Sequence, residues 1–385
     1  MSRKYLTKEL VTRQSQYSFF RHIGMLPNPD KILGRTGKTI EAYRDLKNDP
    51  HVWSCIQSRK SGLLAMDWEL VPGDAPALIT REIRNILDDL DIQKIIREIL
   101  ETPLFGYQPM EAIWQRTSGR RKFIVPEDII AKPQEWFIYD TAGRLRYRKD
   151  GRPEGEMPPP YKILDLKYEA SYQNPYGHAL LGKCYWPVTF KNGGMRFWVN
   201  FMERYGMPML IGQYNRGATF EESEKLAREL AGMTEDSVIV APSDIDITMQ
   251  EAARTNSVDL YKELIKNCNA EISKALLSQT LTTELDMGSY AASQTHYKIR
   301  REVIRADIRI VEKAINSVIK WIAELNFPAG ELPKFRIRQD EAENDSRIER
   351  DLKIAQSAGV RFTKEYWMRT YGFREDDIVS VAGSQ

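Results

Sequence analysis

The chain has 385 residues, a length that suggests two or three structural units with enough material for a hydrophobic core. Hydrophobic residues make up 42% and charged residues 29%, as in folded globular proteins, which excludes disorder throughout. The 56 basic and 54 acidic side chains leave a net charge of +2, a balance that disfavours a tight sequence-specific nucleic-acid binder.

The first third of the chain mixes helix and strand signals. Residues 1–50 are polar and interrupted by Gly and Pro, which predicts an extended N-terminal arm, either a partner contact or a mobile terminus. A helix is predicted to begin at Pro50 with Asp49 as its N-cap, followed by a strand over Trp68–Val71. Two apolar stripes predict two helices, or one broken helix, within residues 76–101.

Alternating segments separated by turn residues predict a run of strands after Pro103. The Gly- and Pro-rich residues 151–160 predict a loop. Taken together, residues 51–185 predict one α+β unit. The strand candidates are Met110–Trp114, Lys122–Val125, Trp136–Tyr139, Leu145–Arg148 and Tyr161–Tyr168.

Long helices dominate from residue 186 onward. Residues 186–206 predict a first helix, although Gly193 and Gly194 weaken it by about 1 kcal/mol each unless they permit close packing or a kink. Residues 207–250 predict a small strand–helix–strand unit with Thr219 as the helix N-cap. Residues 255–278 predict a second long helix.

The last third contains the strongest helix signal. Residues 279–295 are small, polar and non-periodic, which predicts a loop, and residues 296–326 predict a long helix. Residues 327–385 predict a short strand at Phe335–Arg338 and two further helices, the last capped by Thr363. Aliphatic side chains spaced by four and three residues form a seam, and we hypothesise that it needs a partner surface, leaving an isolated chain marginally stable. The seam consists of Ile304, Ile308, Val311, Ile315, Val318 and Ile322.

The order of these parts resembles the Mu-like family of phage portal proteins. The resemblance rests on Asp49–Lys60, on Asn174–Trp186 with Phe201–Pro208, and on Glu271–Thr282, and it covers roughly residues 40–370. It implies an α+β subunit that assembles into a ring. The implied parts are an arm (1–50), a wing (51–185), two stem helices (186–206 and 255–278), a clip (207–250), a tunnel loop (279–295), a long channel-lining or core helix (296–326), and a return strand with a helical crown (327–385).

The resemblance also implies a function. The ring, with twelve copies as the family's number, would form a DNA conduit at one capsid vertex. It would dock the terminase large subunit during packaging, then the head–tail adaptor, and serve as the exit channel for the genome. Further implied partners are the scaffold, the major capsid protein and double-stranded DNA bound without sequence specificity. The implied location is the virion portal vertex, with the host cytoplasm during assembly, and no cofactor is implied.

The candidate tunnel loop has no Lys or Arg between Gln279 and Gln294, so it could touch DNA without the salt-dependent grip of phosphate contacts. The alternative is an ordinary solvent-exposed loop. The candidate channel residues are Thr280, Thr282, Thr283, Glu284, Asp286, Ser289 and Ser293.

A basic edge recurs every four residues on the predicted long helix, formed by Arg301, Arg305, Arg309 and Lys313. Such an edge faces a neighbouring subunit or DNA, and burial of helix sides in a ring favours the neighbour. The alternative is a solvated face, paired with nearby acidic residues. Those acidic residues are Glu302, Asp307 and Glu312.

Two other function classes remain to be weighed. Gly177–Cys184 has the GxxxxGK spacing of a nucleotide-binding P-loop, but Cys184 stands where a magnesium-binding Ser or Thr belongs. Gly34–Thr39 looks similar at a glance, but it lacks the first Gly and predicts a plain loop. A DNA-binding or scaffolding protein that forms no ring would instead carry a salt-responsive basic patch.

No catalytic site, metal site or membrane span is expected. The chain has no GxSxG motif, no HExxH motif and no CxxC pair. Three widely spaced cysteines, Cys55, Cys184 and Cys268, argue against a disulfide framework. The N-terminal residues lack the apolar segment of a signal peptide, and no apolar run is long enough to cross a membrane.

Overall fold

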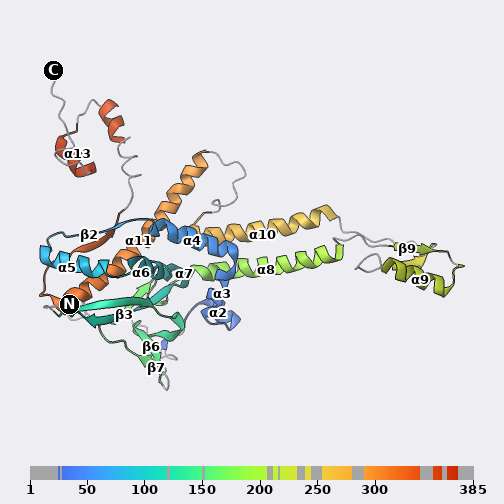
Figure 1. Ribbon diagram of the computed structural model, residues 1–385, viewed down its shortest axis with the longest axis horizontal. Helices are drawn as coiled ribbons and strands as arrows, with labels where there is room; N and C mark the ends of the chain where they lie inside the picture. The colour runs from blue at the N-terminus through green and yellow to red at the C-terminus, as the bar shows by residue number, and fades with distance from the viewer. Residues whose placement is uncertain are drawn as a thin grey trace, which may run out of the picture.

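The long axis of the molecule is set by two helices that leave an α+β body side by side, α8 (Leu180–Tyr205) and α10 (Arg254–Leu277) (Figure 1). A small unit lies beyond their far ends. In this computed structural model the described residues are 25–26, 28–118, 122–149, 152–205, 211–215, 217–231, 239–243, 254–279, 290–338, 350–357 and 362–371.

Helix α4 (Pro50–Leu64) begins where the sequence predicts it. The Asp49 carboxylate accepts hydrogen bonds from the backbone N–H groups of His51 and Val52, at 2.9 and 3.0 Å, and Pro50 occupies the first turn. Strand β2 (Trp68–Val71) follows, also as predicted. It pairs antiparallel with β11 (Lys334–Ile337), so an early and a late segment of the chain meet in one two-stranded sheet.

The predicted extended arm is wrong for residues 28–48, which fold onto the body as α2 (Lys31–Thr36), α3 (Glu41–Asp45) and the 3-10 turn η3 (Leu46–Asn48). Asp30 caps α2 and Gly37, at φ 64°, ends it, so Gly34–Thr39 is not the plain loop predicted. The side chains that anchor this segment are Leu33, Ile40, Tyr43 and Leu46, all buried.

Two antiparallel sheets form the strand-rich part of the body. In one, β3 (Tyr107–Arg116) lies between β4 (Ile124–Ala131) and β8 (Ile163–Lys167). Strand β4 starts near the predicted segment and continues past Pro126, because a shift in register at Ile113/Trp114 accommodates the proline.

The other sheet has the order β1-β5-β6-β7, with β1 (Met25–Leu26), β5 (Phe137–Asp140), β6 (Leu145–Lys149) and β7 (Arg152–Glu156). Strand β7 corrects the loop predicted for residues 151–160. It is an edge strand, where a proline is tolerated, and Gly155 at φ 62° brings its backbone close to the carbonyl oxygen of Tyr147.

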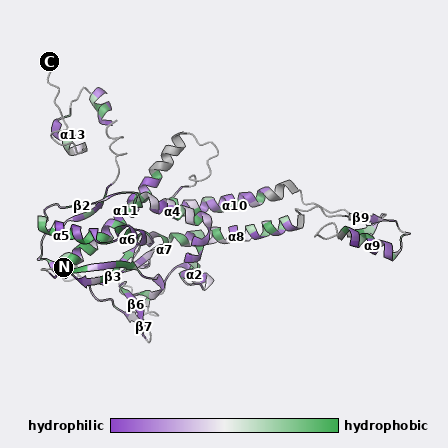
Figure 2. Cartoon of the chain, viewed as in Figure 1, coloured by the Kyte–Doolittle hydropathy of each residue, from purple (hydrophilic) through white to green (hydrophobic). Residues whose placement is uncertain are grey.

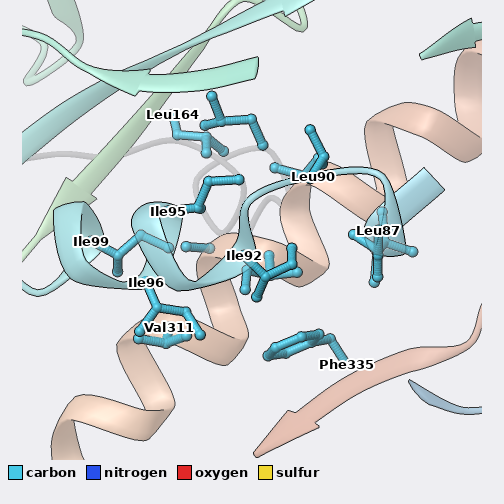
Figure 3. Close-up of a cluster of buried hydrophobic side chains, with 14 of the residues drawn as sticks. Leu87, Leu90, Ile92, Ile95, Ile96, Ile99, Leu164, Val311 and Phe335 are labelled. Atoms are coloured by element: carbon cyan, nitrogen blue, oxygen red, sulfur yellow. The ribbon is translucent and has the colours of Figure 1, made fainter. Parts of the chain in front are cut away.

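Helices α5 (Ala77–Asp88) and α6 (Ile92–Ile99), both predicted, fill the space between the β4-β3-β8 sheet and α11 (Tyr290–Asn326). Figure 3 shows Ile95 near Leu164 of β8, and Ile96 near Val311 of α11. The seam on α11 is therefore buried within its own chain, against α5, α6 and β11. The hypothesis that this seam needs a partner surface is wrong, because the chain supplies the partner.

A second cluster joins the strand-rich part to the long helices. The rings of Tyr107, Tyr139 and Tyr176 contact one another edge to face, next to α7 (Thr102–Phe105). Buried side chains from the start of α8 and the end of α10 complete it: Leu181, Cys184, Tyr185, Val188, Ile272, Leu276 and Leu277.

Helix α8 begins six residues before the predicted residue 186 and passes through Pro187, Gly193 and Gly194 without a break. Its first two turns are held by the buried cluster, and this packing outweighs the low helix propensity of these residues. The boundary predicted between residues 185 and 186 therefore lies inside a helix.

The small unit consists of β9 (Ile211–Tyr214), α9 (Phe220–Ala231) and β10 (Ile239–Pro242), with the two strands parallel. Thr219 and Glu222 form a capping box, in which the Glu222 carboxylate accepts from the Thr219 backbone N–H at 2.8 Å. The predicted strand–helix–strand unit and its cap are confirmed.

The C-terminal helices are also confirmed within the described residues. Residues 350–357 are helical, and α13 (Lys364–Tyr371) starts after Thr363, whose hydroxyl oxygen accepts from the Tyr366 N–H at 3.2 Å. The Tyr366 hydroxyl donates to Asp351 at 2.8 Å and joins the two helices.

Candidate functional site

In the described part of the chain, three helices meet at one junction: α4, the end of α10 and the first half of α11. Arg59 of α4 is its centre. Its Nε and Nη2 atoms donate to the two carboxylate oxygens of Asp307 on α11, at 2.7 and 2.8 Å, and its Nη1 donates to the carbonyl oxygen of Leu276 at 2.8 Å. One guanidinium therefore ties three helices together.

The Arg59–Asp307 pair is almost fully buried, with side-chain exposures of 7% and 1%. Burial lowers the pKa of Arg59, but the hydrogen bonds to Asp307, the negative charge of Asp307 and the interaction with Tyr168 together outweigh burial and raise the pKa, so the arginine stays charged. Because desolvation offsets much of the attraction in such a pair, its main effect is to fix geometry.

Two further sets of contacts make α4 the common support of the long helices. Lys191 of α8 forms an ion pair with Asp49 at 2.5 Å and donates to Asn269 of α10 at 3.1 Å. The His51 ring lies 2.8 Å from the Ser273 hydroxyl of α10. The N-terminal end of α4 thus holds α8 and α10, and its C-terminal half holds α11.

The segment predicted to face a channel connects α10 to α11. Helix α10 ends at Leu277, followed by Ser278 in a left-handed conformation at φ 58°, and α11 begins at Tyr290. The candidates Thr280, Thr282, Thr283, Glu284, Asp286 and Ser289 lie outside the described residues.

Ser293 is a correction, because it lies within α11 and not in a loop running to residue 295. Ala291 and Ala292 have the highest helix propensity of any residue type and extend the strongly periodic helix toward its N-terminus.

The basic edge lies along one side of α11. Arg301 and Arg305 are half-buried, whereas Arg309 and Lys313 are exposed. Two of the acidic residues expected to pair with this edge are engaged elsewhere. Asp307 binds Arg59, and Glu312 accepts from Arg336 at 2.7 Å and from the Ile337 N–H at 3.1 Å. Asp307 and Glu312 thus each bind a cation outside the basic edge.

The geometry contradicts a nucleotide site at Gly177–Cys184. Residues from Leu180 onward are helical, and Cys184 is fully buried. The N–H of His178 donates to the carbonyl oxygen of Tyr168 at 3.0 Å, and that of Gly177 to Asn174 at 3.3 Å. These amides are thus not available to cradle a phosphate, as a P-loop requires.

Arg59, which joins the three helices, was not among the site residues predicted from the sequence. The available signal was a lone arginine on the apolar side of a predicted helix, together with a lone aspartate one residue from the seam of another. Cys55, Cys184 and Cys268 are buried free thiols, as expected. Within the described residues, no cluster of potential metal ligands and no helix able to span a membrane is found.

Comparisons with known proteins give consistent results. The family described as the portal protein of Mu bacteriophage matches residues 40–373. The Mu-like prophage FluMu protein gp29 of Haemophilus influenzae is 25% identical over 339 residues, which cover 83% of this chain and 64% of that protein. The portal protein of Escherichia phage Mu is 27% identical over 309 residues, 76% of this chain and 59% of that protein. The chain thus spans roughly three fifths of the length of these relatives.

Solved structures show the same fold. A chain from the virion of a native gene transfer agent particle aligns with a TM-score of 0.57 at 12% identity, covering 86% of this chain and 93% of that chain. A chain from the neck of an empty gene transfer agent particle gives 0.55 at 13% identity, covering 90% and 94%.

Proposed function

The chain belongs to the family of Mu bacteriophage portal proteins, and we propose that it forms a ring at one capsid vertex through which the phage genome enters and leaves. Membership of this family agrees with the expectation that the chain is not an enzyme. The observation that carries the proposal is the match over residues 40–373, which includes every element that meets at Arg59.

The junction at Arg59 supports a conduit. Helices α10 and α11 flank residues 280–289, and α4 holds both of them. On the α10 side, the segment begins four residues after Leu276, whose carbonyl oxygen Arg59 holds. We assign Thr280, Thr282, Thr283, Glu284, Asp286 and Ser289 to this tunnel loop.

The loop's composition suits sliding. It contains Glu284 and Asp286 but no Lys or Arg, so it makes no firm phosphate contact that would slow DNA in a salt-dependent way. The basic edge formed by Arg301, Arg305, Arg309 and Lys313 is assigned to a neighbouring copy. The helix that carries it packs its apolar seam inward and leaves Arg309 and Lys313 exposed.

We assign the remaining parts by position. The α+β body up to the start of α8 is the wing, α8 and α10 are the stem, and the unit of β9, α9 and β10 is the clip. The clip, at the far end of the stem, docks the terminase large subunit during packaging and afterwards the head–tail adaptor. Twelve copies, assembled with the scaffold and major capsid protein in the host cytoplasm, would give a ring that remains in the virion.

A genetic experiment tests the proposal. In the phage that encodes the chain, an early stop codon should leave heads without nuclease-protected DNA, and supplying the chain from a plasmid should restore protection. Normal amounts of protected DNA without the chain would contradict a portal function. In a packaging reaction with purified heads, Glu284→Lys with Asp286→Lys should slow packaging more at low than at high salt, whereas Glu284→Gln with Asp286→Gln should not.

A further inference from the structure

Helix α8 has four distinct faces, and the first is packed against α10. Lys191 reaches Asn269, Gly194 lies against the side chain of Leu264, and the ring of Trp198 stacks on Tyr261 with centroids 6.5 Å apart. The α8 residues of this face are spaced by three and four positions, as expected for one side of a helix.

The face opposite α10 is polar. Its side chains are all exposed and carry one positive and one negative charge: Thr189, Asn192, Arg196, Asn200 and Glu203. At 100° per residue, the centre of this face lies about 180° from the centre of the α10-facing side. This polar face of α8 can therefore stay exposed to solvent.

The two flanks between these faces are apolar and exposed, and Figure 2 shows hydrophobic residues along α8. On the first flank Trp186, Phe190 and Phe197 are 46%, 56% and 64% exposed, and Trp186 stacks on Phe190. On the second flank Met195, Val199 and Met202 are 44%, 44% and 47% exposed. The two flanks lie about 170° apart at 100° per residue.

The first flank also contains a notch. Gly193 lies between Phe190 and Phe197 at helical spacing, and a Cβ atom added there meets nothing within 4 Å. Because Phe190 and Phe197 are exposed and the space at Gly193 is open, a side chain of another copy can pack at this position.

These four faces indicate what covers the flanks. Exposed apolar rows of this length mark contact sites, and one partner cannot cover two opposite sides of a helix. On α10 the charged residues Lys262, Glu263 and Lys266 are exposed together with Leu260 and Leu264, whereas each flank of α8 carries three exposed apolar side chains. A head-to-tail ring requires two different surfaces on each subunit, whereas a two-fold dimer requires one.

We propose that the flank of Trp186, Phe190 and Phe197 in one copy packs against the flank of Met195, Val199 and Met202 in the next copy around the ring. A methionine of the second flank enters the notch at Gly193. The contact rests on the proposed function, since only a closed ring covers both flanks of every copy.

Cross-linking tests the direction of the contact. Because the native cysteines are buried, Phe197→Cys and Val199→Cys introduce accessible thiols into the full chain. With a short bismaleimide, a mixture of the two variants should give cross-linked dimers, the double variant should give a ladder of higher multimers, and either single variant alone should give neither. Dimers from each single variant alone would indicate a two-fold contact and overturn the proposal.

A variant at Gly193 tests the proposed contact independently of whether the chain forms a ring at all. Gly193→Leu fills the notch without a clash inside the chain, and should reduce the fraction of protein in rings at least tenfold with an unchanged circular dichroism spectrum. Arg196→Leu, on the polar face, is the matched control and should leave the rings intact. Wild-type rings that persist unchanged in Gly193→Leu would overturn the contact but not the portal function. A wild-type chain that forms no ring would overturn both.

Discussion

At the scale of single residues, the fold is organised by a few buried charges that join segments distant in sequence. Arg59 connects α4, the last turn of α10 and α11, and Glu101, just after α6, receives both Lys47 and Lys60. The Arg59 contacts hold α10 and α11 on α4, at the base of the proposed stem.

Removing one partner of the buried pair should be costly. Arg59→Met leaves Asp307 buried without its cation and should lower the free energy of unfolding by about 3–5 kcal/mol. Combining it with Asp307→Leu should recover most of this loss. Urea denaturation measures both. Lys320→Ala, at an exposed ion pair on the same helix, is the control and should change stability by no more than about 0.5 kcal/mol. An Arg59→Met chain as stable as wild type would show that the pair is dispensable.

Glu101 should make part of the stability depend on acidity. Burial alone would raise its pKa, but attraction to Lys60 and Lys47 outweighs burial and holds the pKa below the usual value of 4.5. A carboxylate with a depressed pKa in the folded state stabilises above about pH 4.5, and this contribution is lost as the pH falls through the folded-state pKa.

The variant Glu101→Gln isolates this effect. It should be less stable than wild type at pH 7, because Lys60 is then buried without its carboxylate, and the difference should shrink as the pH falls below about 4.5. Unfolding curves at several pH values measure it. A difference that stays constant from pH 7 to pH 3 would contradict the role of Glu101.

At the scale of elements, Gly177 shows how tightly the backbone just before α8 is packed. Gly177 has φ 73°, and an added Cβ atom would lie 2.3 Å from the carbonyl oxygens of Gly106 and Tyr168. Gly177→Ala should therefore destabilise the chain by about 1–3 kcal/mol, as overpacking does.

Gly34→Ala is the matched control. Its Cβ atom meets nothing within 4 Å inside α2, so it should be neutral or stabilising by up to about 1 kcal/mol. Thermal unfolding of the two variants compares them. Equal melting temperatures for Gly177→Ala and wild type would show that the backbone at Gly177 can move aside.

Elements with strong local signals were predictable from the sequence. The caps at Asp49, Thr219 and Thr363 and the apolar stripes of α5, α6 and α11 all correspond to observed elements. Elements held by distant contacts were not. Strand β7 depends on pairing with β6, and residues 28–48 depend on a buried cluster that includes residues more than 100 positions away, such as Tyr176 and Leu181.

The residues of the candidate site also differ in whether a local sequence pattern predicts them. The basic edge is predictable because residues that repeat every four positions lie on one side of any helix. The role of Arg59 does not follow from any local pattern, because its partners Leu276 and Asp307 lie more than 200 residues away in sequence. Sequence periodicity also could not reveal that α5, α6 and β11 cover the seam of α11.

At the scale of the whole molecule, the distribution of apolar surface separates folding from assembly. The seam of α11 is buried within its own chain, so the body does not need a neighbouring copy to bury its core. Part of the exposed apolar surface lies instead on the two flanks of α8, where a neighbouring copy can reach it. The chain is therefore expected to fold as a monomer and to assemble afterwards.

Particle mass combined with negative-stain imaging tests the portal function most directly. The protein should be co-expressed with the capsid and scaffold proteins of the same phage and then purified. Twelve chains of 44.6 kDa predict annular particles of about 535 kDa, closed by head-to-tail contacts. Particles of one or two chains under these conditions, with no annular images, would contradict the account.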